Sequence, residues 1–364
     1  MAYTTIDDPT QYFEALIWTG DGNTPRSLTG LEFQPDMVWS KRRDDAAGHN
    51  ILDSVRGAGV DAELCPSSDG VEGSNNQNAY GYLSAFTSDG FTVTEGSSDN
   101  AYWNNNTATY VAWCWKAETS FTNDQSATGV GSIDSAGSIN TTAGFSIIGF
   151  TGDAQTGTTI AHGLGVKPNM IILKNREPDV ANWQVYHSSL DATDYLQLNS
   201  TGASTDSNTR WNDVEPTSSV FTTGSSGDVC GDSSGETFIS YCFANVQGFS
   251  KFGSYVGNGN ADGTFVYTGF RPAYIMSKSH TNTESWIIKD ATRDSFNSAD
   301  TNLAANSTSS ESTWGTEYDI DILSNGFKMR DAAGQTNGSG YGFIYMAFAE
   351  APFVNSNGVP NNAR

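Results

Sequence analysis

The sequence predicts an all-β fold built from three tandem β-sandwich units of a jelly-roll-like kind. Its apolar segments are four to eight residues long, rich in Val, Ile, Thr and aromatics, and bounded by Gly, Asn, Asp or Ser. That composition is typical of strands and turns. Four landmarks also recur three times in the same order, and their first-to-last separations are 90, 86 and 86 residues. A propeller blade has only about 40 to 50 residues, so the spacing favours a two-sheet sandwich.

The landmarks define the expected strands of each unit in chain order. The first is an apolar run ending in a Gly-Asp or Gly-Asn turn, at 17–21, 149–153 and 254–258. The second is a proline, a β-rich run and a lysine, at 35–41, 168–174 and 272–278. The third is a polar turn and a phenylalanine, at 88–91, 218–221 and 324–327. The last is a closing strand at 110–115, 238–243 and 343–348. Its first copy is apolar on both faces, which predicts a strand buried between two layers.

These landmarks divide the chain into four parts. Residues 1–118 form the first predicted sandwich, 144–247 the second, and 248–364 the third with a C-terminal tail. Residues 119–143 are rich in Ser, Thr, Gly, Asn and Ala with little apolar periodicity, which predicts a flexible or meandering linker. We therefore expect the second and third units to share an interface and the first to sit apart.

The charge is strongly unbalanced. The chain has 41 acidic and 18 basic side chains and a net charge of −23, which excludes a basic nucleic-acid-binding protein. We expect a solvated acidic surface, and we predict neither a secretory signal nor membrane insertion. The second landmark nevertheless ends in a lysine in every unit, at Lys41, Lys174 and Lys278. A salt bridge to a nearby carboxylate is the expected role of these lysines, with a ligand contact as the alternative.

The four cysteines show neither a disulfide pattern nor a zinc-site spacing. Cys114 and Cys242 occupy the position that holds Ala347 in the third unit, which predicts small buried side chains. Cys65 and Cys230 fall in polar loops, where an inert thiol and a mutual disulfide both stay open.

Catalytic motifs are absent from the sequence, and the four histidines occupy no repeated position. A glycosidase would need only two carboxylates across a cleft. Five acidic residues could supply them, but the sequence nominates no pair: Asp53, Glu63, Asp191, Glu215 and Glu236. We therefore predict no enzymatic activity and no obligatory cofactor.

Two kinds of residue are candidates for ligand binding. Oxygen-bearing side chains alternate after two turn glycines, at Asp21 and Asn23 and at Asn258, Asn260 and Asp262. This arrangement suits Ca²⁺, although plain turn chemistry requires the same residue types. Three tryptophans lie among polar neighbours and could stack on a glycan, or could instead be core residues: Trp103, Trp211 and Trp314.

Several segments together resemble a repeat domain of virion proteins from marine tailed phages, notably those that infect cyanobacteria and pelagic bacteria. They are MAYTTIDDP at 1–9, PDMVWSKRRD at 35–44, LDSVRG at 52–57, SDGF at 88–91 and YVAWCWK at 110–116. The resemblance is strong over the first unit and covers the other two by their landmarks, so it accounts for nearly the whole chain. In those units the 52–57 segment aligns with 185–190 and 288–293 in weakened form.

The resemblance implies a non-enzymatic structural protein on the virion surface, assembled in the host cytoplasm. A tail-fibre or appendage component for host adsorption is the leading expectation, with other virion proteins and a host-surface glycan or receptor as partners. A homo-oligomer, preferably a trimer, is expected. A capsid or tail decoration protein is the alternative, and a polysaccharide depolymerase is the third.

Overall fold

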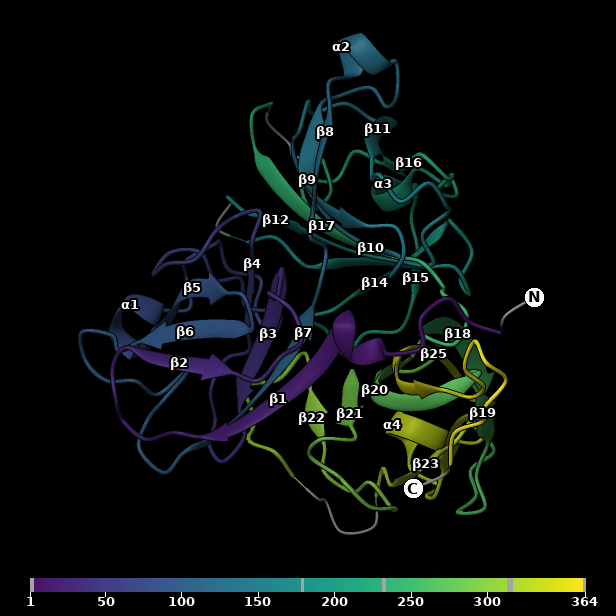
Figure 1. Ribbon diagram of the computed structural model, residues 1–364. Helices are drawn as coiled ribbons and strands as arrows, with labels where there is room; N and C mark the ends of the chain where they lie inside the picture. Colours follow the sequence, from purple (N-terminus) through teal and green to yellow (C-terminus); the bar gives the residue numbers. More distant parts are fainter. Residues whose placement is uncertain (1–2, 178–179, 231–233, 313–316, 363–364) are drawn as a thin grey trace.

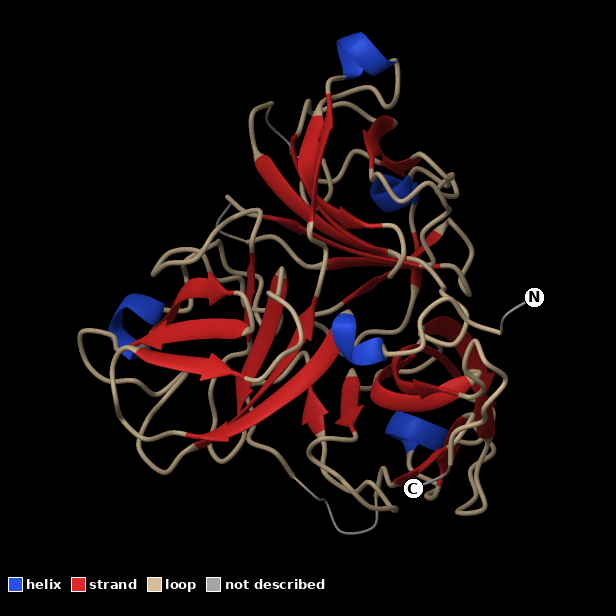
Figure 2. Cartoon of the chain, viewed as in Figure 1, coloured by secondary structure: helices blue, strands red, loops and turns tan. Residues whose placement is uncertain are grey.

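The computed structural model describes residues 3–177, 180–230, 234–312 and 317–362. Strands dominate it, with only short helices between them (Figure 2). The predicted all-β class is confirmed.

Unit 1 is a two-sheet sandwich. Its larger sheet has the order β1 (Phe13–Thr19), β7 (Thr109–Trp115), β3 (Met37–Arg42) and β4 (Asn50–Asp53). The smaller sheet has the order β2 (Arg26–Thr29), β6 (Gly90–Thr94) and β5 (Tyr82–Thr87). The first strand therefore pairs with the last, and the second with the last but one, in agreement with the predicted jelly-roll-like order. Two short helices, η1 (Pro9–Gln11) and α1 (Gln77–Tyr80), complete the unit.

Units 2 and 3 repeat this order. In unit 2 the larger sheet contains β10 (Phe145–Thr151), β17 (Thr237–Phe243), β12 (Met170–Asn175), β13 (Gln184–His187), β14 (Asp194–Gln197) and β15 (Thr205–Asp206). β11 (Thr158–Ala161) and β16 (Val220–Thr223) form the second layer, beside α3 (Asn208–Trp211). In unit 3 the larger sheet is β18 (Ser250–Val256), β25 (Gly342–Pro352), β20 (Phe270–Ser279), β21 (Ile287–Asp290) and β22 (Leu303–Ala304). Its smaller sheet is β19 (Phe265–Tyr267), β24 (Gly326–Met329) and β23 (Ile320–Leu323), with α4 (Gly334–Asn337) nearby.

Strand register makes the three units comparable residue by residue. The repeated lysines lie opposite Val111, Ile239 and Ile344 of the closing strands. The phenylalanines of the third landmark pair with Leu28, Ile160 and Val266 of the second strands. The sequence landmarks thus mark equivalent positions in space.

The stretch predicted as a linker is instead part of unit 2. It forms β8 (Thr119–Asn123), α2 (Gln125–Thr128) and β9 (Ser135–Asn140), and β9 pairs with β10 along six residues from Phe145 to Phe150. Phe121, Ile133 and Ile139 pack against the unit 2 core. The linker prediction was wrong because a few apolar side chains and a full backbone ladder suffice to hold a hairpin on an existing sheet edge.

The expectation that unit 1 sits apart is also wrong. The three units surround a common centre, with unit 1 at the left, unit 2 at the top and unit 3 at the lower right of Figure 1. One core cluster contains side chains from all three units, while each unit keeps a second core inside its own sandwich. Three equivalent aromatics, Trp115, Phe243 and Phe348, contact one another at centroid distances of 6.4, 6.0 and 5.6 Å. The chain therefore has internal pseudo-threefold symmetry.

Candidate functional site

Each unit joins the next through a ring nitrogen that meets a backbone carbonyl. Trp183 donates to the Cys65 carbonyl at 3.0 Å, and Trp286 donates to the Gln197 carbonyl at 2.9 Å. His49 holds the equivalent position in unit 1, and its Nε2 lies 3.1 Å from the Ala304 carbonyl. Trp39 donates to His49 Nδ1, which leaves the proton of this neutral ring on Nε2. The three contacts close a cycle around the pseudo-threefold axis.

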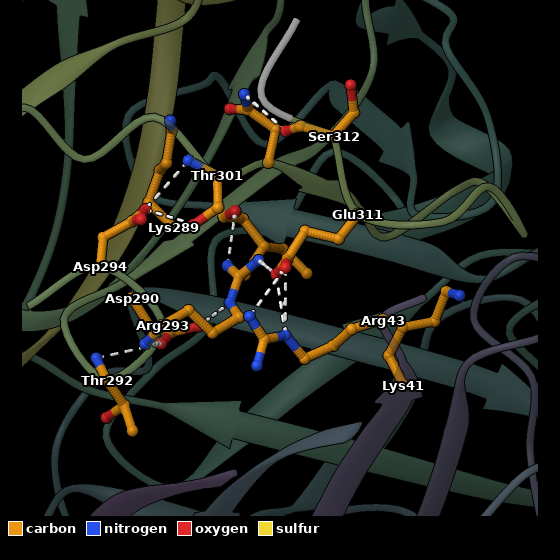
Figure 3. A network of polar contacts seen from close by, with 12 residues as sticks. Lys41, Arg43, Lys289, Asp290, Thr292, Arg293, Asp294, Thr301, Glu311 and Ser312 are labelled. Carbon is orange, nitrogen blue, oxygen red and sulfur yellow. Dashed lines mark hydrogen bonds and ion pairs between the residues drawn. The ribbon is translucent and has the colours of Figure 1, made fainter. Parts of the chain in front are cut away.

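Largely buried ion triads, each of an aspartate, an arginine and a glutamate, occupy two of the three interfaces, and a second arginine from the neighbouring unit joins each triad. At the interface of units 3 and 1, Arg293 contacts Asp290 at 2.5 Å and Glu311 at 2.9 Å, and Arg43 of unit 1 contacts the same glutamate at 2.8 Å (Figure 3). Trp113 of unit 1 also donates to Asp290 at 3.0 Å. Because these charges are paired and hydrogen-bonded, their burial is tolerated, and breaking the set is costly.

The interface of units 1 and 2 repeats the arrangement. Arg56 contacts Asp53 at 2.6 Å and Glu72 at 2.7 Å, and Arg176 of unit 2 contacts Glu72 at 2.6 Å. Tyr241, equivalent to Trp113, donates to Asp53 at 2.7 Å. Burial, together with the Asp53 carboxylate, keeps the pKa of Tyr241 well above its usual value.

Sequence comparison missed these triads because it aligned 52–57 with 288–293 one residue out of register. Strand pairing places Asp53 and Asp290 opposite Met37 and Tyr274, which are equivalent. With that register, an Asp-x-x-Arg signal recurs in units 1 and 3. The two glutamates follow their arginines at different spacings, 72 − 56 = 16 and 311 − 293 = 18 residues, so the Asp-x-x-Arg signal does not lead to them. Both follow the equivalent leucines, Leu64 and Leu303, by eight residues, but only strand pairing shows that these leucines correspond.

The third interface lacks the charges. His187 of unit 2 stands where the aspartates stand, and its Nε2 lies 3.2 Å from the Tyr345 carbonyl of unit 3. Leu190 stands where Arg56 and Arg293 stand in the other units. Ser204 stands where the glutamates stand, because its N–H donates to the His280 carbonyl as the glutamate N–H groups donate to the carbonyls of Arg176 and Arg43. Burial lowers the pKa of His187 to about 4. His187 is therefore neutral at neutral pH, and this interface has no counterpart of the buried Asp–Arg pair.

The repeated lysines do not form the predicted salt bridges within the described part of the chain. All three are fully buried, and each ammonium donates to the carbonyl of the next residue at 2.5 to 2.6 Å. Lys278 also reaches the carbonyls of Thr201 and Asn282. Burial lowers the pKa of each to about 8. The salt-bridge prediction was wrong because the strand end lies inside the molecule, where backbone carbonyls replace water and carboxylates.

Two of the three tryptophans considered for glycan stacking lie in the described residues, and both are buried. Trp103 is 0% exposed and Trp211 is 1% exposed, and both belong to sandwich cores. The core alternative therefore holds for these two, because the loops that carry them fold inward over the small sheets. Trp314 lies outside the described residues.

The candidate calcium residues are engaged in turns. Asp21 accepts from the N–H of Asn23 at 3.0 Å and from Asn104 at 2.8 Å. Asn258 accepts in the same way from Asn260 and from Asn337. Asn260 accepts from Asp262, whose carboxylate pairs with Lys328. Within the described ranges, no three His, Cys, Asp or Glu side chains form a metal-binding group. Calcium binding stays a prediction.

All four cysteines are free and buried, so the disulfide alternative is wrong. Burial raises the pKa of Cys242 to about 12. Cys65 has equivalents in the other two units, because its neighbour Leu64 pairs with β4 as Leu196 and Leu303 pair with β13 and β21. The Cys230 thiol donates to Asp153 and to the Gln155 carbonyl, as the amides of Asn104 and Asn337 do in their own units. Both cysteines thus have structural roles.

The carboxylates considered for hydrolysis have separate partners. Asp53 belongs to the triad described above, Glu215 pairs with Lys167 and accepts from Tyr186, and Glu236 accepts from Asn175. Glu63 is fully buried, and desolvation raises its pKa to about 7. Asp191 is exposed.

A groove lies where unit 1 meets the added hairpin. It has a volume of about 660 Å³ and lies between Val55 of unit 1 and the strands β8, β9, β10 and β17. An adjoining hollow continues it past Ser120, Thr122 and Ser138. Arg176 and the carboxylates of Asp124 and Asp134 also reach its wall. The groove can therefore offer hydroxyl groups and both signs of charge to a polar ligand.

Within the described residues, no helix is long and apolar enough to cross a membrane. No curated protein matches the chain, and no solved structure does. One family model does match, and it is described as a domain of unknown function, DUF7483. The match runs over residues 8–352 and thus includes all three units and the added hairpin. The complete three-unit arrangement is therefore the family domain, and the chain belongs to the DUF7483 family.

Proposed function

We propose that the protein is a non-enzymatic structural protein of the virion surface, a tail-fibre or appendage component that contributes to host adsorption. The observation that carries the proposal is the pseudo-threefold fusion of three sandwiches around one core. It is joined by the sequence resemblance to repeat domains of phage virion proteins.

The architecture suits a rigid support for binding surfaces. The inner faces of all three large sheets are used in the common core, and buried ion pairs fix two of the interfaces. Outward loops and grooves then keep a fixed position, which lowers the entropy cost of binding. Polar grooves of this kind, such as the one beside Val55, can take a host glycan or receptor loop.

The symmetry also suggests how the protein is held. Three similar lobes around one axis can sit on a threefold-symmetric fibre or tail component with one lobe against each subunit. In that arrangement the partner supplies the threefold symmetry. The expected homo-oligomer, a trimer of this chain, is a separate proposal.

A capsid or tail decoration protein is the second candidate. The three units gather around a common axis instead of stacking along a shaft (Figure 1), which suits a cap or a surface plate as well as a fibre tip. The acidic surface would serve solubility in either role.

Two experiments test both candidates. One locates the protein on the virion, and the other competes with the virion for adsorption to the host. Peptides of the chain should be found in purified virions by mass spectrometry, and its density should be found at the tail or an appendage by cryo-electron microscopy. Added folded protein should slow phage adsorption to host cells, whereas heat-unfolded protein should not. Density on the capsid, together with no effect of the added protein on adsorption, would favour the decoration protein. Absence from purified virions would refute both.

A further inference from the structure

A second groove lies on unit 3, away from the junction with the added hairpin. It has a volume of about 420 Å³ and is formed where the N-terminal segment, the β17–β18 connection, β18 and the end of β19 meet. The side chains along it include Tyr3, Asn245, Gln247, Lys251, Tyr267 and Thr268. In a chain with 41 acidic residues, no carboxylate is among the described residues that line this groove.

Lys251 is unusual among the cations of this protein. Every other lysine and arginine in the described ranges forms an ion pair or donates to a backbone carbonyl. Lys251 does neither, although the chain has more than twice as many acidic as basic groups. Lys251 is therefore a groove-lining cation without an internal counter-ion among the described residues.

The internal repeat shows that the fold does not require this lysine. Lys251 lies opposite Ala347, and the equivalent positions in the other units hold Glu14, opposite Cys114, and Ser146, opposite Cys242. A glutamate, a serine and a lysine thus occupy the same strand position in three similar sandwiches.

The same comparison applies to the aromatic wall. Tyr267 is 52% exposed and pairs with Gly326. Its equivalents are Thr29, opposite Gly90, and Ala161, opposite Val220. At these equivalent positions, among the residues that the structure describes, unit 3 alone has both an exposed aromatic ring and a cation without an internal partner, and both line the same groove.

The groove wall is held in place before any ligand arrives. The hydroxyls of Tyr3 and Tyr267 lie 3.0 Å apart, and Tyr3 also donates to the Gly269 carbonyl. Asn245 accepts from the N–H of Phe252 through its oxygen, which leaves its amide nitrogen as a donor toward the groove. Fixed rings and amides reduce the ordering cost of binding.

We propose that this groove binds an acidic saccharide. The Lys251 ammonium would contact the carboxylate or sulfate of the sugar. The Tyr267 ring would stack on the sugar ring, and the amides of Asn245 and Gln247 would bond to its hydroxyls. The biological setting of the site rests on the proposed role in host adsorption, since an acidic sugar on the host surface would be the ligand.

Titration of the full chain with defined probes tests the proposal. The probes are a uronic-acid tetrasaccharide, a sulfated neutral tetrasaccharide, the same neutral tetrasaccharide without sulfate, and sodium sulfate. Calorimetry should show at least tenfold tighter binding of one acidic probe than of the uncharged one, and the two acidic arms separate a carboxylate from a sulfate ligand. Sulfate that binds as tightly as the saccharides would overturn the sugar assignment.

Variants locate the binding. Lys251→Ala and Tyr267→Ala should each weaken binding about tenfold, while Tyr267→Phe should retain most of it. Lys328→Ala and Phe265→Ala are matched controls, because both residues lie in unit 3 outside the groove. The proposal fails if the wild-type chain binds no acidic probe at 10 mM. It also fails if the Lys251 and Tyr267 variants, checked for folding by circular dichroism, bind as tightly as the controls.

These outcomes are separable from those of the proposed function. A chain found on virions that binds no acidic saccharide would refute the groove assignment alone. A chain that binds the saccharide through Lys251 but is absent from virions would refute the virion role alone.

Discussion

Replacing Arg293 with leucine removes the cation of a fully buried ion pair. Arg293 and Asp290 are both 0% exposed, and the arginine contacts Asp290 at 2.5 Å, Glu311 at 2.9 Å and the Ile288 carbonyl at 3.0 Å. The leucine variant keeps the Asp290 carboxylate in the interior without its counter-ion. We expect the free energy of unfolding to fall by about 3–5 kcal/mol, which is a large part of the usual total of about 5–15 kcal/mol.

The third interface supplies a control for this variant. Its equivalent positions hold His187 and Leu190, so the chain itself contains a neutral version of the pair. The double variant Asp290→His with Arg293→Leu copies that version and removes the stranded carboxylate. We expect it to recover at least half of the lost stability, because a packed neutral substitute for a buried ion pair is often close to neutral in stability.

Urea unfolding followed by tryptophan fluorescence measures both effects, since Trp113 donates directly to Asp290. Lys328→Leu is the matched surface control, because it breaks a pair with the exposed Asp262 and should cost no more than about 1 kcal/mol. A loss below 1 kcal/mol for Arg293→Leu would refute the buried-pair reasoning. So would a double variant as unstable as the single one.

Three further predictions concern pH, a lysine and the hairpin. Burial lowers the pKa of His162 and His187 to about 4. Between about pH 6.5 and 4 the unfolded chain therefore binds more protons than the folded chain, and acid destabilises the fold. The free energy of unfolding should therefore fall by about 3 kcal/mol per histidine. Glu63, whose raised pKa acts in the opposite direction, titrates alike in the wild type and in His187→Asn, so urea midpoints of both chains at pH 7.5 and 4.5 isolate the histidine. An equal pH response of the two chains would contradict the prediction. Lys278→Met should cost about 2 kcal/mol, because three carbonyls lose their donor, and thermal unfolding should separate it from the milder Lys328→Met. Hydrogen exchange should be slow across Ser135–Asn140, which pairs with β10. Exchange at the rate of a free peptide would instead support the prediction of a flexible linker.

Much of the fold was predictable because strand and turn signals are local. Short β-rich runs and turn residues located the closing strands, the turn before Phe91 and the strand that contains Lys41. Repetition then supplied what one copy could not, since matched spacing showed that three units share one strand order.

The candidate site was less predictable because exposure is a tertiary property. Trp103 and Trp211 have polar neighbours in sequence but apolar neighbours in space. The Asp-x-x-Arg signal was present, yet a one-residue error in register hid it, because such a slip moves every side chain to the opposite face. The groove around Lys251 joins segments far apart in the chain, and no sequence window contains it.

By itself, the sequence determined the all-β class, the threefold repetition, the equivalent strand positions and the small buried positions of Cys114 and Cys242. These follow from local propensity and from spacing within one unit. The tertiary structure alone decided that the units share a core, that residues 119–143 complete a sheet, and that the repeated lysines are buried. The physical reason is that both faces of each large sheet must be covered, and only the packing of three units against one another determines which side chains do so.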